Sequence, residues 1–173
     1  IAAQATPIAT FPVTVTDDAG RAVTLESMPR RIVSLAPSNT EVLFALGLEE
    51  RIVAVDAYSD FPPAVAEVPT VGDYADPDLE QIVALDPDLV LGTALHAAAI
   101  VPRLDELGIP AVVLEPTSLD AILASIETVG RLAGIAEDAA ALVCSLQERV
   151  DTVERAVAGA PRPRVFFELS PDL

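Results

Sequence analysis

The sequence RIVSLAPSNTEVLFALG at residues 31–47 joins a short apolar run to a helical pattern. Residues 32–35 are apolar apart from one serine, which is typical of a buried strand. Ser38 stands three residues before Glu41, the spacing of a capping box, and Gly47 offers a stop. The segment therefore predicts a strand that is followed at once by a helix starting near Ser38.

The same unit recurs along the chain. Runs that are apolar at nearly every position indicate strands covered on both faces, and strands that alternate with helices indicate parallel βαβ units. We therefore predict an α/β fold, with a Rossmann-like lobe built on a parallel sheet. The expected strands lie at residues 32–35, 52–55, 89–91 and 111–114, and the expected helices at residues 38–46, 76–85, 95–107 and 118–133.

The N-terminal part of the chain precedes this pattern. Residues 1–10 are small, uncharged and aperiodic, and we interpret them as a flexible leader. Alternating runs at residues 13–16 and 22–25 flank an Asp/Gly turn and predict a β-hairpin. We place the N-terminal α/β lobe at residues 11–134.

A long helix is predicted after this lobe. Residues 137–158 contain neither Gly nor Pro, and their apolar positions form one stripe. We place a linker helix at residues 135–160. The apolar run at residues 165–169 predicts a strand, which we interpret as the start of a second, truncated lobe at residues 161–173. The alternative is that this strand returns to the edge of the first sheet.

The composition removes several classes of function. Lys and Arg together number 10 against 27 Asp and Glu, a formal net charge of −17, which argues against a nucleic-acid or anionic-membrane surface. No run is long and apolar enough to cross a bilayer. The single cysteine, Cys144, excludes an internal disulfide and is expected to be a small packing residue of the long helix. The single histidine, His96, excludes a metal site of paired histidines.

The sequence contains no familiar catalytic motif, neither a glycine-rich nucleotide loop nor a nucleophile elbow. Its acid pairs, such as Asp17 with Asp18 and Asp86 with Asp88, fall at expected turns and helix ends. We interpret them as solvated caps and turn formers. The prediction is a protein that is not an enzyme, with no catalytic residue, no metal site and no intrinsic cofactor.

A binding site is expected at the loops that follow the carboxyl ends of the strands, where open α/β sheets bind their ligands. Both tyrosines, Tyr58 and Tyr74, fall on this rim, and so does His96. Aromatic rings with a few polar groups suit an amphipathic organic ligand. Two alternatives stay open: the tyrosines only cover the sheet edge, and His96 is a partly buried structural residue.

Three segments together carry a family resemblance. They are APSNTE at residues 36–41, YSDFPP at residues 58–63 and LEQIVALDPDLV at residues 79–90. As a set they resemble the N-terminal lobe of ABC-transporter substrate-binding proteins of the helical-backbone class, and the cobalamin-binding members most of all. Such proteins carry cobalamin, ferric siderophores or haem in a cleft between two α/β lobes that one long helix joins. The resemblance implies the same architecture here.

The resemblance also implies the ligand-binding residues. Tyr58 matches an aromatic residue that contacts the corrin ligand, and Tyr74 falls where cobalamin binders have a tryptophan. Thr93 falls where they have another tryptophan, so one stacking surface is absent. With their neighbours on the rim, the predicted ligand-binding residues are Tyr58, Asp73, Tyr74, Thr93 and His96.

Glu80 is the predicted docking residue. It lies on the helix at residues 76–85, which we expect to begin with Asp76 as N-cap and Pro77 as its first residue. The expected buried face is Leu79, Ile82 and Val83, which leaves Glu80 exposed. The resemblance matches Glu80 to a surface glutamate that pairs with arginines on the transporter's membrane subunits.

The charges of the rim loops favour a neutral or cationic ligand, such as cobalamin or a hydroxamate complex. Anionic siderophore complexes are recognised by arginine, and these loops contain none. The acidic residues of the rim are Asp56, Asp60, Asp73, Asp76 and Glu115.

The leading hypothesis is therefore a solute-binding subunit of an ABC importer. It would capture a corrinoid or a similar metal chelate outside the cytoplasm, periplasmic or lipid-anchored, and deliver it to the membrane permease. Three rivals stay open. The ligand is a ferric siderophore or haem; the protein is a small α/β enzyme that uses rim carboxylates; or it is an interaction module that dimerises through the apolar stripe of its long helix.

Overall fold

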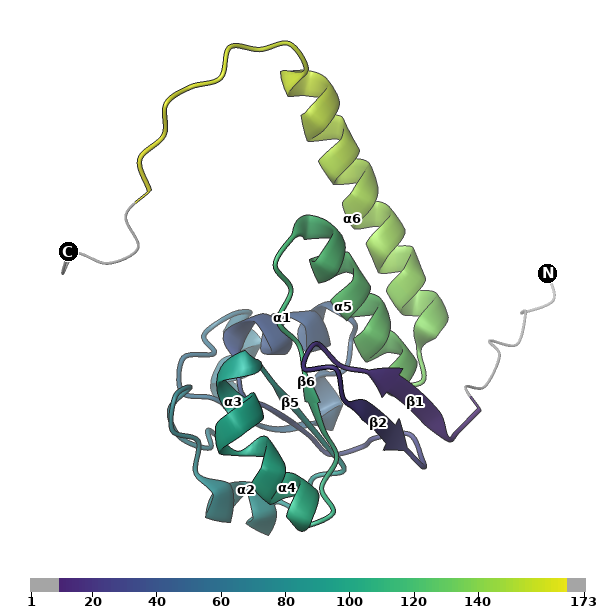
Figure 1. Ribbon diagram of the computed structural model, residues 1–173, viewed down its shortest axis with the longest axis vertical. Helices are drawn as coiled ribbons and strands as arrows, with labels where there is room; N and C mark the ends of the chain where they lie inside the picture. The colour runs from purple at the N-terminus through teal and green to yellow at the C-terminus, as the bar shows by residue number, and fades with distance from the viewer. Residues whose placement is uncertain (1–9, 168–173) are drawn as a thin grey trace.

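The computed structural model describes residues 10–167, and the leader predicted at residues 1–10 lies outside this range except for Thr10. Figure 1 shows a layered α/β body from which one long helix rises. The strands are β1 (Val13–Thr16), β2 (Ala22–Leu25), β3 (Ile32–Ser34), β4 (Ile52–Val55), β5 (Leu89–Gly92) and β6 (Ala111–Val113). The α-helices are α1 (Pro37–Ala45), α2 (Leu79–Ala84), α3 (Ala94–Ala99), α4 (Val101–Glu106), α5 (Leu119–Leu132) and α6 (Ala136–Val157), and two short 3₁₀ helices lie at Glu49–Arg51 and Pro63–Glu67.

The central sheet has the strand order β4-β3-β5-β6, with all three pairings parallel. One face packs with α1, α5 and the hairpin β1–β2, and the other packs with α2, α3 and α4 (Figure 1). Residues that alternate along each strand serve the two faces: Ile32 enters the first cluster and Val33 the second. The predicted α/β fold with a parallel sheet and an N-terminal hairpin is confirmed.

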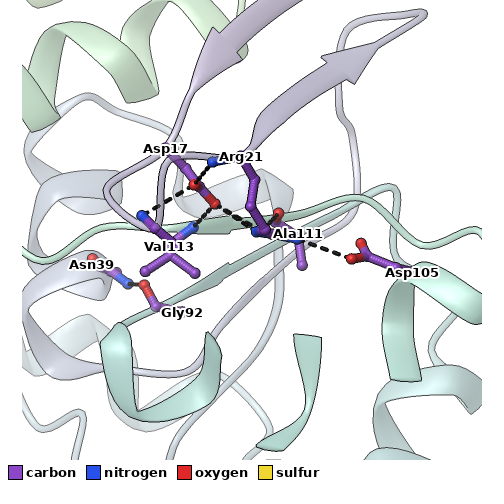
Figure 2. Close-up of polar contacts among 8 residues, drawn as sticks. Asp17, Arg21, Asn39, Gly92, Asp105, Ala111 and Val113 are labelled. Carbon is purple, nitrogen blue, oxygen red and sulfur yellow. Dashed lines mark hydrogen bonds and ion pairs between the residues drawn. The ribbon is translucent and has the colours of Figure 1, made fainter. Parts of the chain in front are cut away.

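The hairpin turn covers the open edge of β6 (Figure 2). The Asp17 carboxylate accepts hydrogen bonds from the Val113 backbone N–H at 3.2 Å and from the Arg21 guanidinium at 2.7 Å. Asp18 N–H donates to the Val113 carbonyl at 3.0 Å, and Arg21 also donates to the Ala111 carbonyl. Polar groups that would otherwise stand unpaired at a sheet edge are therefore satisfied. Asp17 is only 5% exposed, so the expectation of a solvated turn former was wrong for this residue.

Two helices begin elsewhere than the sequence predicts. The N-cap of α1 is Ala36 and not Ser38, because Pro37 has the backbone angle of a first helical residue. The N-cap of α2 is Asp78, whose side chain accepts from Gln81 N–H at 3.0 Å, and not Asp76. Val83 is 38% exposed and does not belong to the buried face of α2, which Ile82 forms.

The helix predicted at residues 95–107 is two helices, α3 and α4, which meet at Ile100. Pro102 explains the break: it has no N–H to donate to the Ala98 carbonyl, and its ring crowds that carbonyl. Pro102 is tolerated in the first turn of α4 instead.

The long helix α6 packs on α5 near its beginning and leaves the lobe towards its end (Figure 1). The two helices touch at Gly130, where an added Cβ would lie 2.2 Å from the Cβ of the fully buried Ala139. Towards the far end Val153 is 62% exposed. Cys144 is also exposed, so it is not the packing residue that we expected, since its side of α6 does not meet α5.

Residues 165–167 do not form the predicted strand. A strand needs a hydrogen-bonded neighbour, and this segment pairs with nothing within residues 10–167. Its apolar side chains are 78–85% exposed. The rest of the predicted strand, residues 168 and 169, lies outside the described residues. No helix among those described has the length and apolar character that a membrane crossing requires.

Candidate ligand-binding cleft

A cleft of about 740 Å³ lies at the carboxyl ends of the strands, where the sequence predicts the site. Its rim comes from the loops that follow β4, β5 and β6, and α1, α5 and α6 supply its walls. The lining residues are Ser38, Asn39, Glu41, Val42, Ala45, Tyr74, Thr93, Leu114, Glu115, Pro116, Ile122, Ser125, Ile126, Leu142, Leu146 and Arg149. Most of the lining is apolar, with a few polar groups on the rim, which suits an amphipathic ligand.

Two of the five predicted ligand-binding residues, Tyr74 and Thr93, line this cleft. Their hydroxyl groups lie 3.0 Å apart and share a hydrogen bond. This bond orients the tyrosine ring beside the end of β5. Although the segments around Tyr74 and Thr93 are distant in sequence, the fold brings them together as the rim pattern predicts.

His96 lies behind Tyr74 and is buried, with 1% of its surface exposed. Its Nδ1 accepts from the Thr93 backbone N–H at 3.0 Å, so the proton is on Nε2, which donates to the Tyr74 carbonyl at 2.8 Å. The two rings meet edge to face at 5.3 Å. Burial lowers the pKa of His96, and the Tyr74 carbonyl opposes that shift. This geometry makes His96 a residue that positions Tyr74.

Asn39 fixes the start of α1 to the sheet, a contact that the sequence analysis did not identify. Its side-chain amide donates to the Gly92 carbonyl at 3.1 Å (Figure 2). A side chain at Gly92 would crowd the histidine, because a Cβ there would lie 3.1 Å from the Cβ of His96. The only sequence signal was that Asn39 follows a predicted strand by a few residues.

Tyr58 and Asp73 lie outside the lining of this cleft and pair with each other. The Tyr58 hydroxyl donates to the Asp73 carboxylate at 2.9 Å, and this bond together with the negative charge raises the pKa of Tyr58. Tyr58 is 59% exposed and therefore accessible to a ligand or to a second lobe. The structure thus divides the predicted aromatic pair into a cleft residue, Tyr74, and a residue of the outer rim, Tyr58.

Besides Asp73, two more of the acidic rim residues are engaged by the protein itself. Asp56 is 1% exposed, and its carboxylate accepts from Ser59 Oγ at 2.6 Å and from the Tyr58 backbone N–H at 2.9 Å. Glu115 accepts from the Ala94 N–H at the start of α3. The negative character of the rim is therefore weaker than a count of acidic residues suggests.

The wall formed by α6 was missed by the sequence analysis, which considered only the loops after the strands. Leu142, Leu146 and Arg149 follow each other at helical spacing and lie on one face of α6, where they line the cleft. The rim loops contain no arginine, but α6 adds Arg149 to the lining of the cleft. No sequence signal could have placed Arg149 here, because its position depends on the angle at which α6 packs on α5.

Glu80 is exposed in the first turn of α2 and is not part of the cleft, as its predicted docking role requires. No cluster of three or more histidine, cysteine or acidic side chains that could hold a metal ion occurs within residues 10–167.

Comparisons with known proteins agree on one family. A model described as periplasmic binding protein matches residues 32–172. An uncharacterized ABC transporter substrate-binding lipoprotein of Bacillus subtilis is 34% identical over 94% of this chain and 54% of its own. A cobalamin-binding protein of Halobacterium salinarum is 34% identical over 96% of this chain and 47% of its own. The chain spans about half the length of the curated relatives it matches.

Solved structures agree with this assignment. The periplasmic vitamin B12 binding protein of Vibrio cholerae aligns with a TM-score of 0.75 and 30% identity, over 82% of this chain and 56% of its own. A periplasmic heme binding protein of Pseudomonas aeruginosa aligns with a TM-score of 0.70 and 28% identity, over 79% of this chain and 51% of its own. A structure from the ABC-type Fe³⁺-hydroxamate transport system of Saccharomonospora viridis aligns with a TM-score of 0.70 and 31% identity, over 86% of this chain and 58% of its own. With a family match over most of its length and the same fold, the chain belongs to the periplasmic binding protein family.

Proposed function

We propose that this chain forms one half of the ligand-binding cleft of an ABC importer's solute-binding subunit, and that the ligand is a corrinoid or a similar metal chelate. The cleft at the carboxyl ends of the strands, with Tyr74 and Thr93 on its rim, carries the proposal. Relatives named as cobalamin or vitamin B12 binders support the choice of ligand. The family name and the lipoprotein relative indicate an extracytoplasmic location, periplasmic or lipid-anchored.

Calorimetric titration of the natural full-length protein with cyanocobalamin, haemin and a ferric hydroxamate tests this function. Tyr74→Ala should weaken the best ligand by about 1–3 kcal/mol, because an aromatic anchor in the cleft is lost. Tyr74→Phe is the matched control: it keeps the ring and loses only the bond to Thr93. If all three ligands fail to bind, or if Tyr74→Ala binds as tightly as wild type, the proposed site is wrong.

Haem or a ferric siderophore is the second candidate ligand. Two structural relatives, at 28% and 31% identity, are described as a heme binder and an Fe³⁺-hydroxamate transport protein. Thr93 favours a ferric siderophore, since a small polar side chain occupies a rim position of the cleft where an aromatic side chain would stack on a corrin or porphyrin ring. The same titration decides between the two ligands.

We propose Glu80 as a contact to an arginine of the permease. An exposed ion pair of this kind steers association more than it adds affinity. Glu80→Arg in the full-length protein should slow uptake into vesicles that contain the permease, at low salt, and leave ligand titration unchanged. Glu50→Arg, on an exposed site of the 3₁₀ helix Glu49–Arg51, is the control for a charge reversal elsewhere. Normal uptake by the Glu80 variant in a background without the other lobe's docking carboxylate would exclude this role.

The interaction-module rival is also open to test. Val153 and Val157 of α6 are 62% and 56% exposed, an apolar surface that a second copy of the chain could cover. Light scattering of the 173-residue chain separates monomer from dimer. A monomer at high concentration would exclude dimerisation through α6 and would leave the proposed ligand-binding function unaffected.

A further inference from the structure

Arg149 is the one cationic side chain among the residues that line the described cleft. It extends from α6 and lines the same cleft as Tyr74 and Thr93. It also borders a second, apolar hollow of about 450 Å³ between α5 and α6, where Leu119, Val150 and Val153 are among its neighbours. Arg149 therefore lies at the boundary between the cleft and this second hollow.

The guanidinium of Arg149 has no hydrogen bond or ion pair within residues 10–167. Arg21 pairs with Asp17 and Asp105, and Arg51 donates to the Ala133 carbonyl at 2.8 Å. The guanidinium groups of Arg30 and Arg103 also lack a partner among the described residues, but neither of them lines the cleft. The nearest candidates for pairing in the cleft are Glu41 and Glu115, and neither comes within ion-pair distance. A guanidinium without a partner in the protein can donate two parallel hydrogen bonds to the oxygen atoms of a carboxylate or a phosphate.

We infer that Arg149 binds an acidic group at the periphery of the captured chelate, a carboxylate or a phosphate ester. The inference rests on the proposed function and narrows its ligand class. Glu41 of α1 lines the same cleft and has no ion pair within residues 10–167. The ligand class is therefore an amphipathic metal chelate with a neutral or cationic body and at least one acidic substituent.

Paired ligands that differ in the acidic group test this inference on the full-length protein. Haemin carries two carboxylates and its dimethyl ester carries none; cyanocobalamin carries a phosphodiester and dicyanocobinamide carries none. Arg149→Gln should weaken the acid-bearing member of the pair that binds by about tenfold to a hundredfold, as expected for loss of a charge-assisted hydrogen bond. It should change the acid-free member less than twofold.

Two further variants sharpen the result. Arg149→Lys keeps the positive charge but not the planar guanidinium that donates two hydrogen bonds at once. It should therefore bind the acidic ligand more tightly than Arg149→Gln and less tightly than wild type. Arg155→Gln is the matched control on the same helix, since Arg155 donates to the Asp151 carbonyl at 3.1 Å and does not line the cleft. Salt should weaken binding of the acidic ligand to wild type more than to Arg149→Gln.

The outcomes separate this inference from the proposed function. If wild type binds a chelate but Arg149→Gln affects both members of the pair equally, or neither, then Arg149 only packs at the cleft and the inference is overturned. If wild type binds no member of either pair, this inference is overturned, whereas the proposed function fails only if the ferric hydroxamate does not bind either.

Discussion

The edge of the sheet at β6 and the cleft above its carboxyl ends use similar residues in opposite ways. At the edge, Asp17 and Arg21 satisfy one another and the exposed backbone groups of β6 (Figure 2). In the cleft, Arg149 and Glu41 share one hollow without an ion pair. The polar groups at the edge thus form a closed network, in which each has a partner within the protein. Arg149 and Glu41 in the cleft have no such partner and can bind a ligand.

This difference separates residues that stabilise the lobe from residues that bind. A buried network in which every member has a partner is costly to disturb, because each loss leaves another group unsatisfied. Side chains in the cleft are solvated in the absence of ligand, so their replacement should leave stability nearly unchanged. Stability and ligand affinity should therefore respond to different variants.

The largest expected effect is that of Asp17→Asn. The Asp17 carboxylate accepts five hydrogen bonds, three from Arg21 and one each from Ala19 and Val113. Replacing one carboxylate oxygen with an amide N–H turns an acceptor into a donor and should cost about 2–4 kcal/mol of unfolding free energy, measured with urea. Asp105→Asn, which breaks only an exposed ion pair to Arg21, should cost less than about 1 kcal/mol. Equal losses for the two variants would contradict the closed network.

Sequence patterns predicted the order and type of most elements, because each strand of the parallel sheet is a nearly continuous apolar run and the two hairpin strands alternate around a turn. They failed where one residue decides a boundary. Pro102 splits α3 from α4, and Asp78 rather than Asp76 caps α2. The burial of Asp17 could not be predicted, since it depends on the hairpin reaching β6, a contact across 96 residues of sequence.

The second prediction concerns Gly130, which holds α6 against α5 and so sets the width of the cleft. A Cβ at Gly130 would lie 2.2 Å from the Cβ of Ala139, so Gly130→Ala must push the helices apart. We expect a loss of about 1–3 kcal/mol in urea unfolding, despite the better helix propensity of alanine. The double variant with Ala139→Gly should recover most of the loss, because it removes the opposing methyl group.

Gly130 also connects the two regions. Because Leu142, Leu146 and Arg149 follow Ala139 on α6, a displaced helix should weaken ligand binding as well as stability. If Gly130→Ala lowers stability but leaves the affinity of the full-length protein unchanged, α6 does not form a wall of the working cleft.

The rim loops of the site were predictable, and its walls were not. Tyr74 and Thr93 follow from the rule that ligands bind beyond the carboxyl ends of parallel strands. That rule gives no information about helix faces, so Arg149 and Leu146 were missed. The rule also places Tyr58 on the rim without indicating that it lies outside the cleft lining, because loop conformation decides that point.

The third prediction uses His96, which belongs to the scaffold although it supports a cleft residue. Burial lowers its pKa in the folded protein. Below the ordinary pKa of about 6.5 the unfolded chain therefore binds a proton that the folded chain does not, and stability falls as the pH drops. Between pH 7.5 and 5.5 His96 accounts for at most about 1.4 kcal/mol of this loss.

Urea unfolding of wild type and His96→Gln at the two pH values measures this contribution. The variant should be less stable at pH 7.5 and should lose less stability than wild type on acidification. A wild-type protein whose pH dependence equals that of the variant would show that His96 is protonated as readily in the folded state as in the unfolded chain.

The smallest expected effect comes from the overall charge, and it should have opposite signs in the two regions. A formal net charge of −17 opposes the compact state through self-repulsion, which salt screens. Raising NaCl from about 0.02 to 0.3 M should therefore stabilise the lobe by about 0.5 kcal/mol, roughly 1–2 °C in the midpoint of thermal unfolding. Replacing the exposed Glu49 and Glu50 with glutamine lowers the repulsion and should reduce this rise in stability.

The same salt should weaken the contact of Arg149 with an acidic ligand, because screening acts there on an attraction. A midpoint that falls with salt would mean that the favourable ion pairs, such as Arg21 with Asp17, outweigh the repulsion between the acidic residues.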